Sequence, residues 1–361
     1  MKESAYIHIP FCRQKCKYCS FVSFTKQGYT EDYINALLSE IKERYNKEKL
    51  KTLYFGGGTP SLLKPACLEK IFQQFSFAEN PEITIEVNPE FLTETYLKDI
   101  FKLGINRISI GVQSFNEKIL NLIGRKHTVS DALNAVKYAK SAGFSNISID
   151  LIYGLPEQTP KDFEKTLNTA VSLDVTHISS YGLKIDEGSY FYKNKPKNLP
   201  DSDMQADMYL KMTEILEQNG FKHYEISNFA KNGFYSEHNM NYWNAKEYYG
   251  FGCASCGYEN KIRYSHENTI EKYIKNPLFL IKETPQTEQE MLEEYIFLGL
   301  RKKEGINIPY IKNRFKKDFY SQYGNILNKY SEYFEKNGEN INLTDNGFLI
   351  SNIILSEFIE T

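Results

Sequence analysis

Short runs of β-forming residues alternate with amphipathic segments through the first half of the chain. Six runs predict strands, and they cover residues 5–9, 51–55, 83–87, 107–112, 147–152 and 177–183. Between the first two runs, apolar residues recur every four positions from Tyr33 to Tyr45, which predicts a helix over about residues 30–49. A second helical pattern covers about residues 130–142 and is followed by Gly143. Strands that alternate with helices are typical of a parallel sheet, so the pattern predicts an α/β fold.

Polar residues gather where five consecutive predicted strands end. They are a cysteine-rich loop at residues 12–19, a glycine-rich turn at 56–59, and the side chains of Glu86, Gln113 and Asp150. In a (β/α) barrel the carboxyl ends of the strands face the active site. Periodicity alone does not separate a barrel from a doubly wound sheet, but this distribution favours a partial TIM-like (β/α)6 barrel.

The length of the chain indicates more than one domain. At 361 residues it exceeds the size at which a single hydrophobic core stops growing. We predict a barrel core at residues 1–190, an irregular extension at 191–286, and a small α-rich, winged-helix-like domain at 287–361. Winged helices often bind DNA, but this last segment has nine Lys or Arg against twelve Asp or Glu. Because a duplex binder needs a basic surface, we expect no nucleic-acid partner.

The charge and hydropathy of the chain argue against binding to nucleic acid or anionic lipid, secretion and insertion into a membrane. A formal net charge of −2 gives the chain no general attraction for nucleic acid or anionic lipid. The first ten residues reach polar and proline positions too soon for a signal peptide, and eighteen apolar residues never run together. We therefore expect a cytoplasmic protein.

Three cysteines follow the first predicted strand. Cys12, Cys16 and Cys19 have the spacing CxxxCxxC. In a long chain and a reducing compartment, clustered cysteines indicate metal ligands rather than disulfides. Three thiolates can hold a [4Fe–4S] cubane and leave one iron open to a small molecule. The alternative is zinc with His8 or a distant cysteine as fourth ligand, although structural zinc favours two separated Cys-x2-Cys pairs.

The cysteine loop resembles the signature of the radical S-adenosylmethionine (SAM) superfamily. The resemblance implies one oxygen-sensitive [4Fe–4S] cluster on the three cysteines, SAM bound to the open iron, and a low-potential electron donor as partner. The three glycines at residues 56–58 agree with it, because a backbone without Cβ atoms can approach a ligand closely.

Longer segments are similar to the oxygen-independent coproporphyrinogen III oxidase group. They cover residues 6–21, 54–63, 85–90, 106–115, 123–127 and 149–156. The similarity implies that eight residues contact SAM, namely Tyr6, Gly57, Gly58, Thr59, Glu86, Gln113, Arg125 and Asp150. Their chemistry agrees, since carboxylates can accept hydrogen bonds from the amino group or ribose of SAM and an arginine can pair with its carboxylate.

Phe21 distinguishes this chain from the oxidases, which have a fourth cysteine two residues after the third. The pattern CxxxCxxCxF is typical of the related haem chaperones of the HemW type. Residues 238–243, with the sequence HNMNYW, match the HNxxYW motif of that group, which implies haem as ligand and His238 as its axial ligand. From the residues alone, a structural histidine beside a core tryptophan is the alternative.

The resemblance to haem chaperones implies a set of partners. They are haem and haem-requiring apo-proteins such as respiratory cytochromes, with the cluster and SAM controlling transfer or homodimer formation, and with membrane contact only through the recipient. Coproporphyrinogen oxidase activity is expected to be absent. The alternatives are an oxidase or another radical SAM modification of a tetrapyrrole, and a regulatory module on the C-terminal segment.

Two further cysteines lie in a segment where this chain departs from its relatives. Cys256 stands where the sequence GCGAHG of relatives has a histidine. Cys253 and Cys256 can ligate haem iron, hold a second metal or act as small apolar side chains in the core. The last is the commonest role of a free cysteine, so we expect both to be buried.

Overall fold

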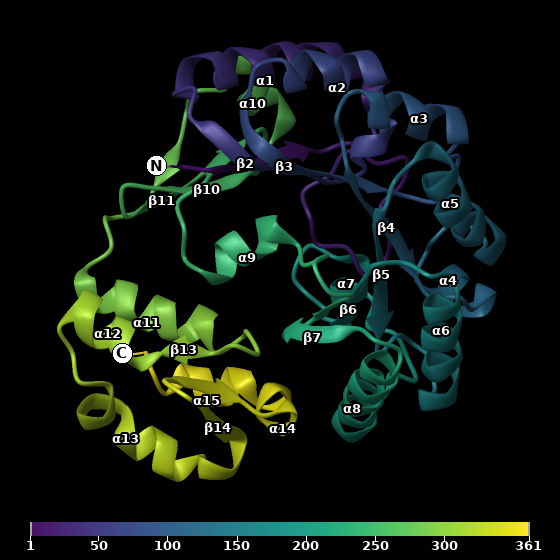
Figure 1. Ribbon diagram of the computed structural model, residues 1–361. Coiled ribbons are helices and arrows are strands. Elements are labelled where there is room, and N and C mark those ends of the chain that lie inside the picture. Colours follow the sequence, from purple (N-terminus) through teal and green to yellow (C-terminus); the bar gives the residue numbers. More distant parts are fainter. Residues whose placement is uncertain (1, 360–361) are drawn as a thin grey trace.

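The computed structural model describes residues 2–359, and its centre is a nine-stranded sheet in the order β7-β8-β6-β5-β4-β3-β2-β1-β9. Six strands pair in parallel with their neighbours in the chain: β1 (Ser4–Ile9), β2 (Lys49–Gly57), β3 (Ser76–Val87), β4 (Arg107–Gln113), β5 (Asn146–Tyr153) and β6 (His177–Gly182). The sheet curves around a central space (Figure 1). The predicted partial (β/α)6 barrel is therefore confirmed.

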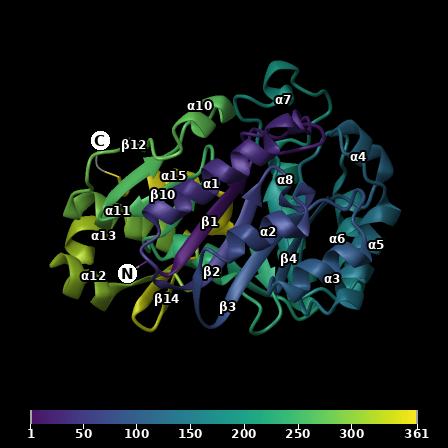
Figure 2. The same ribbon diagram turned by 90° about the horizontal axis from the view of Figure 1, so that it is seen from above.

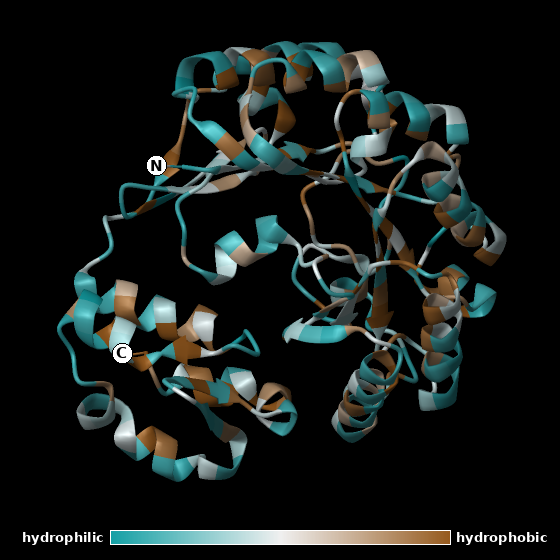
Figure 3. Cartoon of the chain, viewed as in Figure 1, coloured by the Kyte–Doolittle hydropathy of each residue, from teal (hydrophilic) through white to brown (hydrophobic). Residues whose placement is uncertain are grey.

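Helices form the outer layer of this barrel (Figure 2). They are α1 (Thr30–Arg44), α2 (Pro65–Phe72), α3 (Glu94–Lys102), α4 (Glu117–Leu122), α5 (Val129–Ala142) and α6 (Pro160–Ser172), with the short 3-10 turns η1 (Gln27–Tyr29) and η2 (Pro60–Leu62). Hydrophilic and hydrophobic positions mix along them, as in amphipathic helices with one face on the sheet (Figure 3). Gly143 ends α5 with a φ of 106°, a conformation that favours glycine.

The first helix is shorter than the sequence pattern predicts. It ends at Arg44 instead of near residue 49, because β2 already begins at Lys49, which pairs with Ser76 of β3.

The inner face of the barrel is polar. Successive side chains of a strand point to opposite faces. In β4, Ile108 and Ile110 are fully buried in the hydrophobic core, whereas Arg107 and Ser109 line the central cavity. The outer face of the sheet therefore packs against the helices, and the inner face is left for ligands.

Residues beyond β6 add three strands to the same sheet. After α7 (Tyr190–Lys193) and α8 (Ser202–Gln218) come β7 (Lys222–Glu225) and β8 (Asn228–Ala230). β8 pairs antiparallel with β6, and β7 pairs antiparallel with β8. At the other end, β9 (Tyr249–Phe251) pairs in parallel with β1. Between them, α9 (Glu237–Trp243) lies inside the curve of the sheet (Figure 1). The domain boundaries near residues 190 and 286 stay predictions. The segment between them, residues 191–286, is less irregular than the sequence indicates.

The remaining elements form two small units. A separate antiparallel sheet consists of β10 (Cys256–Glu259), β11 (Ile262–Ser265) and β12 (Ile281–Lys282), and α10 (Ile270–Lys275) packs on α1. The last residues form α11 (Glu288–Gly299), β13 (Ile306–Asn307), α12 (Ile308–Phe315), α13 (Phe319–Lys329), η3 (Ser331–Tyr333), β14 (Phe334–Asn337), β15 (Asn340–Leu343), α14 (Asp345–Leu349) and α15 (Ser351–Ser356). Helices with a small antiparallel sheet agree with the α-rich, winged-helix-like prediction. Within residues 2–359, no helix is both long and apolar enough to cross a membrane.

Candidate functional site

A cavity of about 360 Å³ opens at the carboxyl ends of the barrel strands. Its size lies within the range of pockets that bind small molecules and cofactors. Ten of the twelve residues that the sequence assigns to ligands line it: Cys12, Cys16, Cys19, Gly57, Gly58, Thr59, Glu86, Gln113, Arg125 and Asp150. The two that do not line it are Tyr6 and His238. The prediction that five strand ends meet at one mouth is therefore correct.

The three cysteines lie on the loop between β1 and α1, all partly buried. The backbone N–H of Cys12 donates to the carbonyl of Phe24 at 3.0 Å, and that of Lys17 to the carbonyl of Ile123 at 3.0 Å, which fixes both ends of the loop. A Cβ atom added to Gly58 would lie 2.6 Å from the carbonyl oxygen of Phe11 and 3.0 Å from Sγ of Cys12. Glycine is therefore required where the turn after β2 meets the cysteine loop.

The chemistry of the loop fits an iron–sulfur cubane better than zinc. Within residues 2–359, no three His, Cys, Asp or Glu side chains converge on one metal position. A single zinc ion needs such convergence, whereas each cubane thiolate binds a different iron. His8 is not available as a fourth zinc ligand, because its Nδ1 is 3.1 Å from the Tyr6 hydroxyl and its Nε2 is 3.0 Å from the carbonyl oxygen of Val22.

Two of the thiols favour their protonated form. Burial raises the pKa of Cys12, and it raises the pKa of Cys19 to about 11. A cysteine binds iron as its thiolate. Binding of an iron–sulfur cluster at this loop therefore has to release the protons of these thiols.

Arg125 lies beside the cysteine loop and is buried. Its guanidinium donates to Sγ of Cys16 at 3.7 Å and to Oδ1 of Asn88 at 3.0 Å, and its Nε donates to Nδ1 of His127 at 3.1 Å. A further hydrogen bond goes to the carbonyl of Gly111. The arginine therefore holds a fixed positive charge next to a cysteine sulfur, where it can attract the carboxylate of a ligand.

Two carboxylates face the cavity from β3 and β5. Glu86 accepts hydrogen bonds from the Tyr54 hydroxyl at 2.9 Å and from the backbone of Gly57 at 3.2 Å. Burial, and next the charge of Asp150, raises the pKa of Glu86 to about 7. Ser109 donates to both oxygens of Asp150 at 3.0 and 3.1 Å, and burial raises the pKa of Asp150. Both carboxyl groups lie in a setting where a hydroxyl or ammonium group of a ligand would stabilise the charged form.

A β-bulge aims Gln113 into the cavity. The register between β4 and β5 shifts between Gly111 and Gln113, and Gln113 has a φ of 68°. Bulges next to active sites commonly redirect a side chain in this way, and a non-glycine residue with positive φ is held there by its surroundings.

Sequence reasoning missed several cavity residues. They include Tyr54, Arg107, Ser109, Ser179, Tyr181 and Asn239. The available signal was the alternation in segments such as RISIGVQ, where every second residue is polar or glycine. Arg107 is the most unusual of them, because it is 2% exposed and its nearest carboxylate oxygen, Oε2 of Glu82, is 3.9 Å from Nε.

Tyr6 lies beside the cavity rather than in its lining. Its hydroxyl is 3.1 Å from Nδ1 of His8, and its ring stacks on that of Tyr54 with 6.0 Å between the centroids. A contact of Tyr6 with SAM stays a prediction.

His238 lies in the interior of the barrel, with 1% of its surface exposed. Its Nδ1 is 2.8 Å from Oγ1 of Thr52 and its Nε2 is 2.7 Å from the Tyr242 hydroxyl. Burial lowers the pKa of the imidazole to about 3. Both ring nitrogens of His238 already have hydrogen-bond partners, so neither is free to bind haem iron in this structure. The alternative that the sequence left open, a structural histidine, describes its position better.

The two remaining cysteines differ from each other. Cys253 is buried and its thiol donates to the carbonyl of Glu267 at 3.2 Å. Cys256 is exposed at the start of β10. The expectation of a buried side chain holds for Cys253 and is wrong for Cys256, because Cys256 lies at the end of a four-residue strand of the small separate sheet, outside the hydrophobic core.

Comparison with known proteins agrees with this site. A sequence model of the radical SAM superfamily matches residues 6–170, and this is the class that three cysteines on a loop above a partial (β/α) barrel define. A protein named heme chaperone HemW from Lactococcus lactis subsp. lactis is 38% identical over 99% of this chain and 97% of its own length. Another of the same name from Bacillus subtilis is 35% identical over 99% of both chains. The chain therefore belongs to the HemW family of heme chaperones.

Among solved structures, the coproporphyrinogen III oxidase HemN from Escherichia coli, a radical SAM enzyme, superposes with a TM-score of 0.86. The match covers 98% of this chain and 89% of that chain at 22% sequence identity. At this identity the likeness shows that the two proteins share a fold.

Proposed function

We propose that this protein is a cytoplasmic haem chaperone, which binds haem and transfers it to haem-requiring apo-proteins such as respiratory cytochromes. The similarity to proteins named heme chaperone over 97% and 99% of their length carries the proposal. Phe21 supports it further, because this side chain is 67% exposed on the cavity rim at the position where the resembling oxidases have a fourth cysteine.

The cavity is assigned to a [4Fe–4S] cluster and SAM. Cys12, Cys16 and Cys19 would each bind one iron. When bound, the cluster and SAM supply one-electron chemistry at the barrel mouth, and their state would control haem transfer or homodimer formation.

The side chains around the cavity have distinct tasks in this proposal. Glu86 and Asp150 accept hydrogen bonds from the amino group or hydroxyls of SAM, and Arg125 pairs with its carboxylate. The backbone at Gly57 and Gly58 allows close approach, and Gln113 closes the side formed by β4.

Haem binding itself is tested by titration. Haem is added to the purified holoprotein and followed by its Soret absorbance, for wild type, His238→Ala and the matched buried-histidine variant His266→Ala. One haem per chain, delivered afterwards to an apo-cytochrome, is the expected result. No binding by the wild type would refute the chaperone proposal. Equal affinity in the His238 variant would exclude His238 as the ligand, as its hydrogen bonds to Thr52 and Tyr242 suggest.

Porphyrinogen oxidation is the second candidate, favoured by the shared fold with the E. coli oxidase. An anaerobic assay with coproporphyrinogen III, SAM and a reductant separates the two functions. We expect no decarboxylated product, and turnover would make the protein an enzyme. Light scattering with and without reconstituted cluster tests for the homodimer in the same preparations.

A further inference from the structure

Four aromatic rings lead from the central cavity through the interior of the barrel. The first belongs to Tyr54, which lines the cavity and whose ring stacks on the imidazole of His238 with 5.0 Å between the centroids. The ring of Tyr242 meets that imidazole edge-on at 4.9 Å, and the ring of Tyr248 follows at 4.6 Å. The four rings come from β2, from α9 and from the residue before β9, so only the folded chain brings them together.

The two inner tyrosines each have a proton acceptor at the hydroxyl group. The hydroxyl of Tyr54 donates to Oε1 of Glu86 at 2.9 Å, and that of Tyr242 lies 2.7 Å from Nε2 of His238. Because Nδ1 of His238 is 2.8 Å from Oγ1 of Thr52, the ring can carry its proton on Nδ1 and accept at Nε2. An oxidised phenol is a strong acid, so a tyrosine loses an electron readily only where its proton has such an acceptor.

Burial keeps the phenols and the imidazole neutral. It raises the pKa of Tyr54 and that of Tyr242 well above the ordinary value of 10.0, and it lowers the pKa of His238 to about 3. The imidazole therefore has an unprotonated nitrogen ready for the proton that an oxidised Tyr242 releases.

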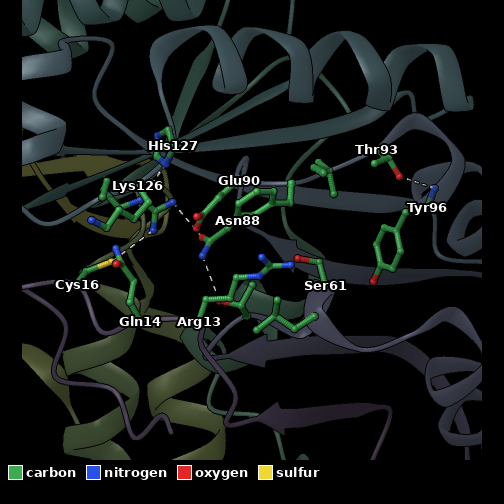
Figure 4. A pocket seen from close by; sticks show the side chains of 15 residues that line it. Arg13, Gln14, Cys16, Ser61, Asn88, Glu90, Thr93, Tyr96, Lys126 and His127 are labelled. Atoms are coloured by element: carbon green, nitrogen blue, oxygen red, sulfur yellow. Dashed lines mark hydrogen bonds between the residues drawn. The ribbon is translucent and has the colours of Figure 1, made fainter. Parts of the chain in front are cut away.

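Tyr96, a tyrosine near the cysteine loop, lacks such an acceptor. It lies in a hollow of about 190 Å³ that Gln14 and Cys16 of the loop also line (Figure 4). Its hydroxyl oxygen is buried and has no hydrogen-bond partner within residues 2–359. The combination of stacked rings with hydroxyl acceptors therefore distinguishes the four rings from other aromatic side chains around the cofactor site.

The outer end of the four rings lies at the surface beside Cys256. Tyr248 is partly exposed, and its backbone pairs with that of Tyr258 on β10. Burial is the main cause of the raised pKa of Tyr248, and the charge of the exposed Cys256 adds to it, so the thiol lies within electrostatic reach of the ring. The rings therefore connect the cavity lining with the outside of the protein.

We propose that these four rings form a pathway that carries an oxidising equivalent out of the cavity. The inference rests on the one-electron chemistry assigned to the cavity, and it goes beyond haem binding. It gives a carbon-centred radical that meets no substrate a harmless exit. Tyrosine is easily oxidised but not reduced, so the pathway is separate from the route by which a low-potential donor supplies electrons.

Each step moves one electron and one proton. A carbon-centred radical in the cavity takes the hydroxyl hydrogen of Tyr54, so that the O–H bond breaks and a C–H bond forms. Tyr54 then regains an electron from Tyr242 and a proton from the carboxyl group of Glu86, while the hydroxyl proton of Tyr242 moves to Nε2 of His238. In the last step Tyr248 gives an electron to Tyr242 and its proton to water, and Tyr242 takes its own proton back from His238.

The test is flash photolysis of the full chain without cofactors. A ruthenium polypyridyl photo-oxidant is attached to Cys256, and 3-aminotyrosine, which is more easily oxidised than tyrosine, replaces Tyr54 as a trap. Cys253 is buried, and the other cysteines are removed by Cys12→Ser, Cys16→Ser, Cys19→Ser and Cys67→Ser. After the flash, the oxidising equivalent travels the same rings in the opposite direction, and we expect an aminotyrosyl radical at position 54 in the EPR spectrum.

Three variants of this labelled chain decide the question. We expect Tyr242→Phe to lower the yield of the trapped radical about tenfold, because the electron then has to cross the interior without a relay. Tyr248→Phe, at the partly exposed end, should lower the yield without disturbing the barrel interior. Tyr96→Phe is the matched control and should leave the yield unchanged.

A lower yield in either variant on the pathway, with the circular dichroism of the parent and no change in Tyr96→Phe, supports the proposal. A yield that is unchanged in both, or that falls equally in Tyr96→Phe, overturns it. Because no haem, cluster or SAM takes part in the photolysis, a failed haem titration would refute the chaperone proposal and leave this result as it is.

Discussion

Glu86 is a cavity side chain whose carboxyl group is about half ionised at neutral pH. Its carboxyl group is enclosed by Tyr54, Gly57 and Asp150, and its pKa is raised to about 7. An acid whose pKa is higher in the folded than in the unfolded protein binds more protons when folded. Stability associated with Glu86 is therefore present below pH 4.5, its ordinary pKa, and is lost as the pH rises to about 7.

We predict that Glu86→Gln stabilises the cofactor-free protein by about 2 kcal/mol at pH 8 and changes its stability little at pH 4.5. An amide keeps the shape of the side chain but has no charge to bury. Urea unfolding at the two pH values measures the difference. Glu79→Gln, at an exposed position of β3, is the control and should be neutral at both. A stability gain that is equal at both pH values would contradict the role of ionisation.

The same titration predicts how SAM binding depends on pH. If the ionised Glu86 accepts hydrogen bonds from SAM, affinity should rise about tenfold between pH 5.5 and 7.5, as the carboxyl group with a pKa of about 7 loses its proton. Calorimetric titration of the holoprotein with SAM measures this rise. In Glu86→Gln the profile should be flat, and a slope equal to wild type would place Glu86 outside the SAM site.

At the scale of elements, α9 is the helix whose placement matters most. Oε1 and Oε2 of Glu82 on β3 accept from the backbone N–H groups of His238 and Glu237, both at 3.0 Å, which secures the first turn of the helix. His238 then bonds to Thr52 of β2, and Asn239 reaches the floor of the cavity. The HNxxYW motif therefore ties α9 to the inside of the barrel.

We predict that His238→Ala lowers the free energy of unfolding by about 2–4 kcal/mol. The substitution leaves the hydroxyl group of Tyr242 without its partner, leaves Thr52 with only a long hydrogen bond of 3.5 Å from Asn241, and opens a cavity in the interior. Tyr242→Phe removes one of the two hydrogen bonds and should lower stability by about 1 kcal/mol. Urea denaturation compares them, and a loss no larger than that of Tyr242→Phe would mean that His238 is not a structural anchor.

A second prediction concerns the strand that holds α9. Glu82→Gln removes the only carboxylate within 4 Å of the Arg107 guanidinium among the described residues, and we expect it to destabilise the protein by about 3–5 kcal/mol. Adding Arg107→Met should recover part of this loss, because the unpaired buried charge is then gone. Thermal unfolding of the single and double variants measures the coupling, and strictly additive effects would show that the two charges do not interact.

How far the sequence predicts these elements depends on their length. The six barrel strands and α5 are long enough for period-two and period-3.6 patterns, and five of the six strand predictions agree with the structure to within two residues at either end. The exception is β3, which begins at Ser76 instead of residue 83, because Ser76 and Phe77 already pair with β2 across a register shift. β9 has three residues, and only its pairing with β1 defines it. The hydrogen bonds of His238 likewise depend on Thr52, 186 residues away, so no local pattern reveals that its ring nitrogens are occupied.

At the scale of the whole molecule, backbone and side-chain hydrogen bonds join the C-terminal segment to the barrel. The backbone N–H of Ile226 donates to the carbonyl of Arg301 at 2.9 Å, and that of Lys303 to the carbonyl of Tyr224 at 3.1 Å. Nζ of Lys302 donates to Oδ1 of Asn244, directly after α9, at 2.7 Å. These contacts join residues far apart in the sequence, which is why the helical patterns along the segment predicted its α-rich character but not how it attaches.

The proposed cofactor ligands, by contrast, are separate from the structural core. The three cysteines lie on a loop at the mouth, partly buried, while the hydrophobic core lies between the sheet and its helices. We predict that replacing Cys12, Cys16 and Cys19 together by alanine abolishes bound iron and sulfide and weakens SAM binding, but shifts the urea midpoint of the cofactor-free protein little. Iron analysis, SAM titration and circular dichroism measure the three effects. Retained iron in this variant would place the cluster elsewhere.

The partial burial of the three cysteines also has a consequence for handling the protein. An iron that no thiolate covers is open to dioxygen as well as to a ligand, so damage by air should begin at that iron. Keeping the cavity filled with SAM during purification should therefore lengthen the life of the brown protein on the bench.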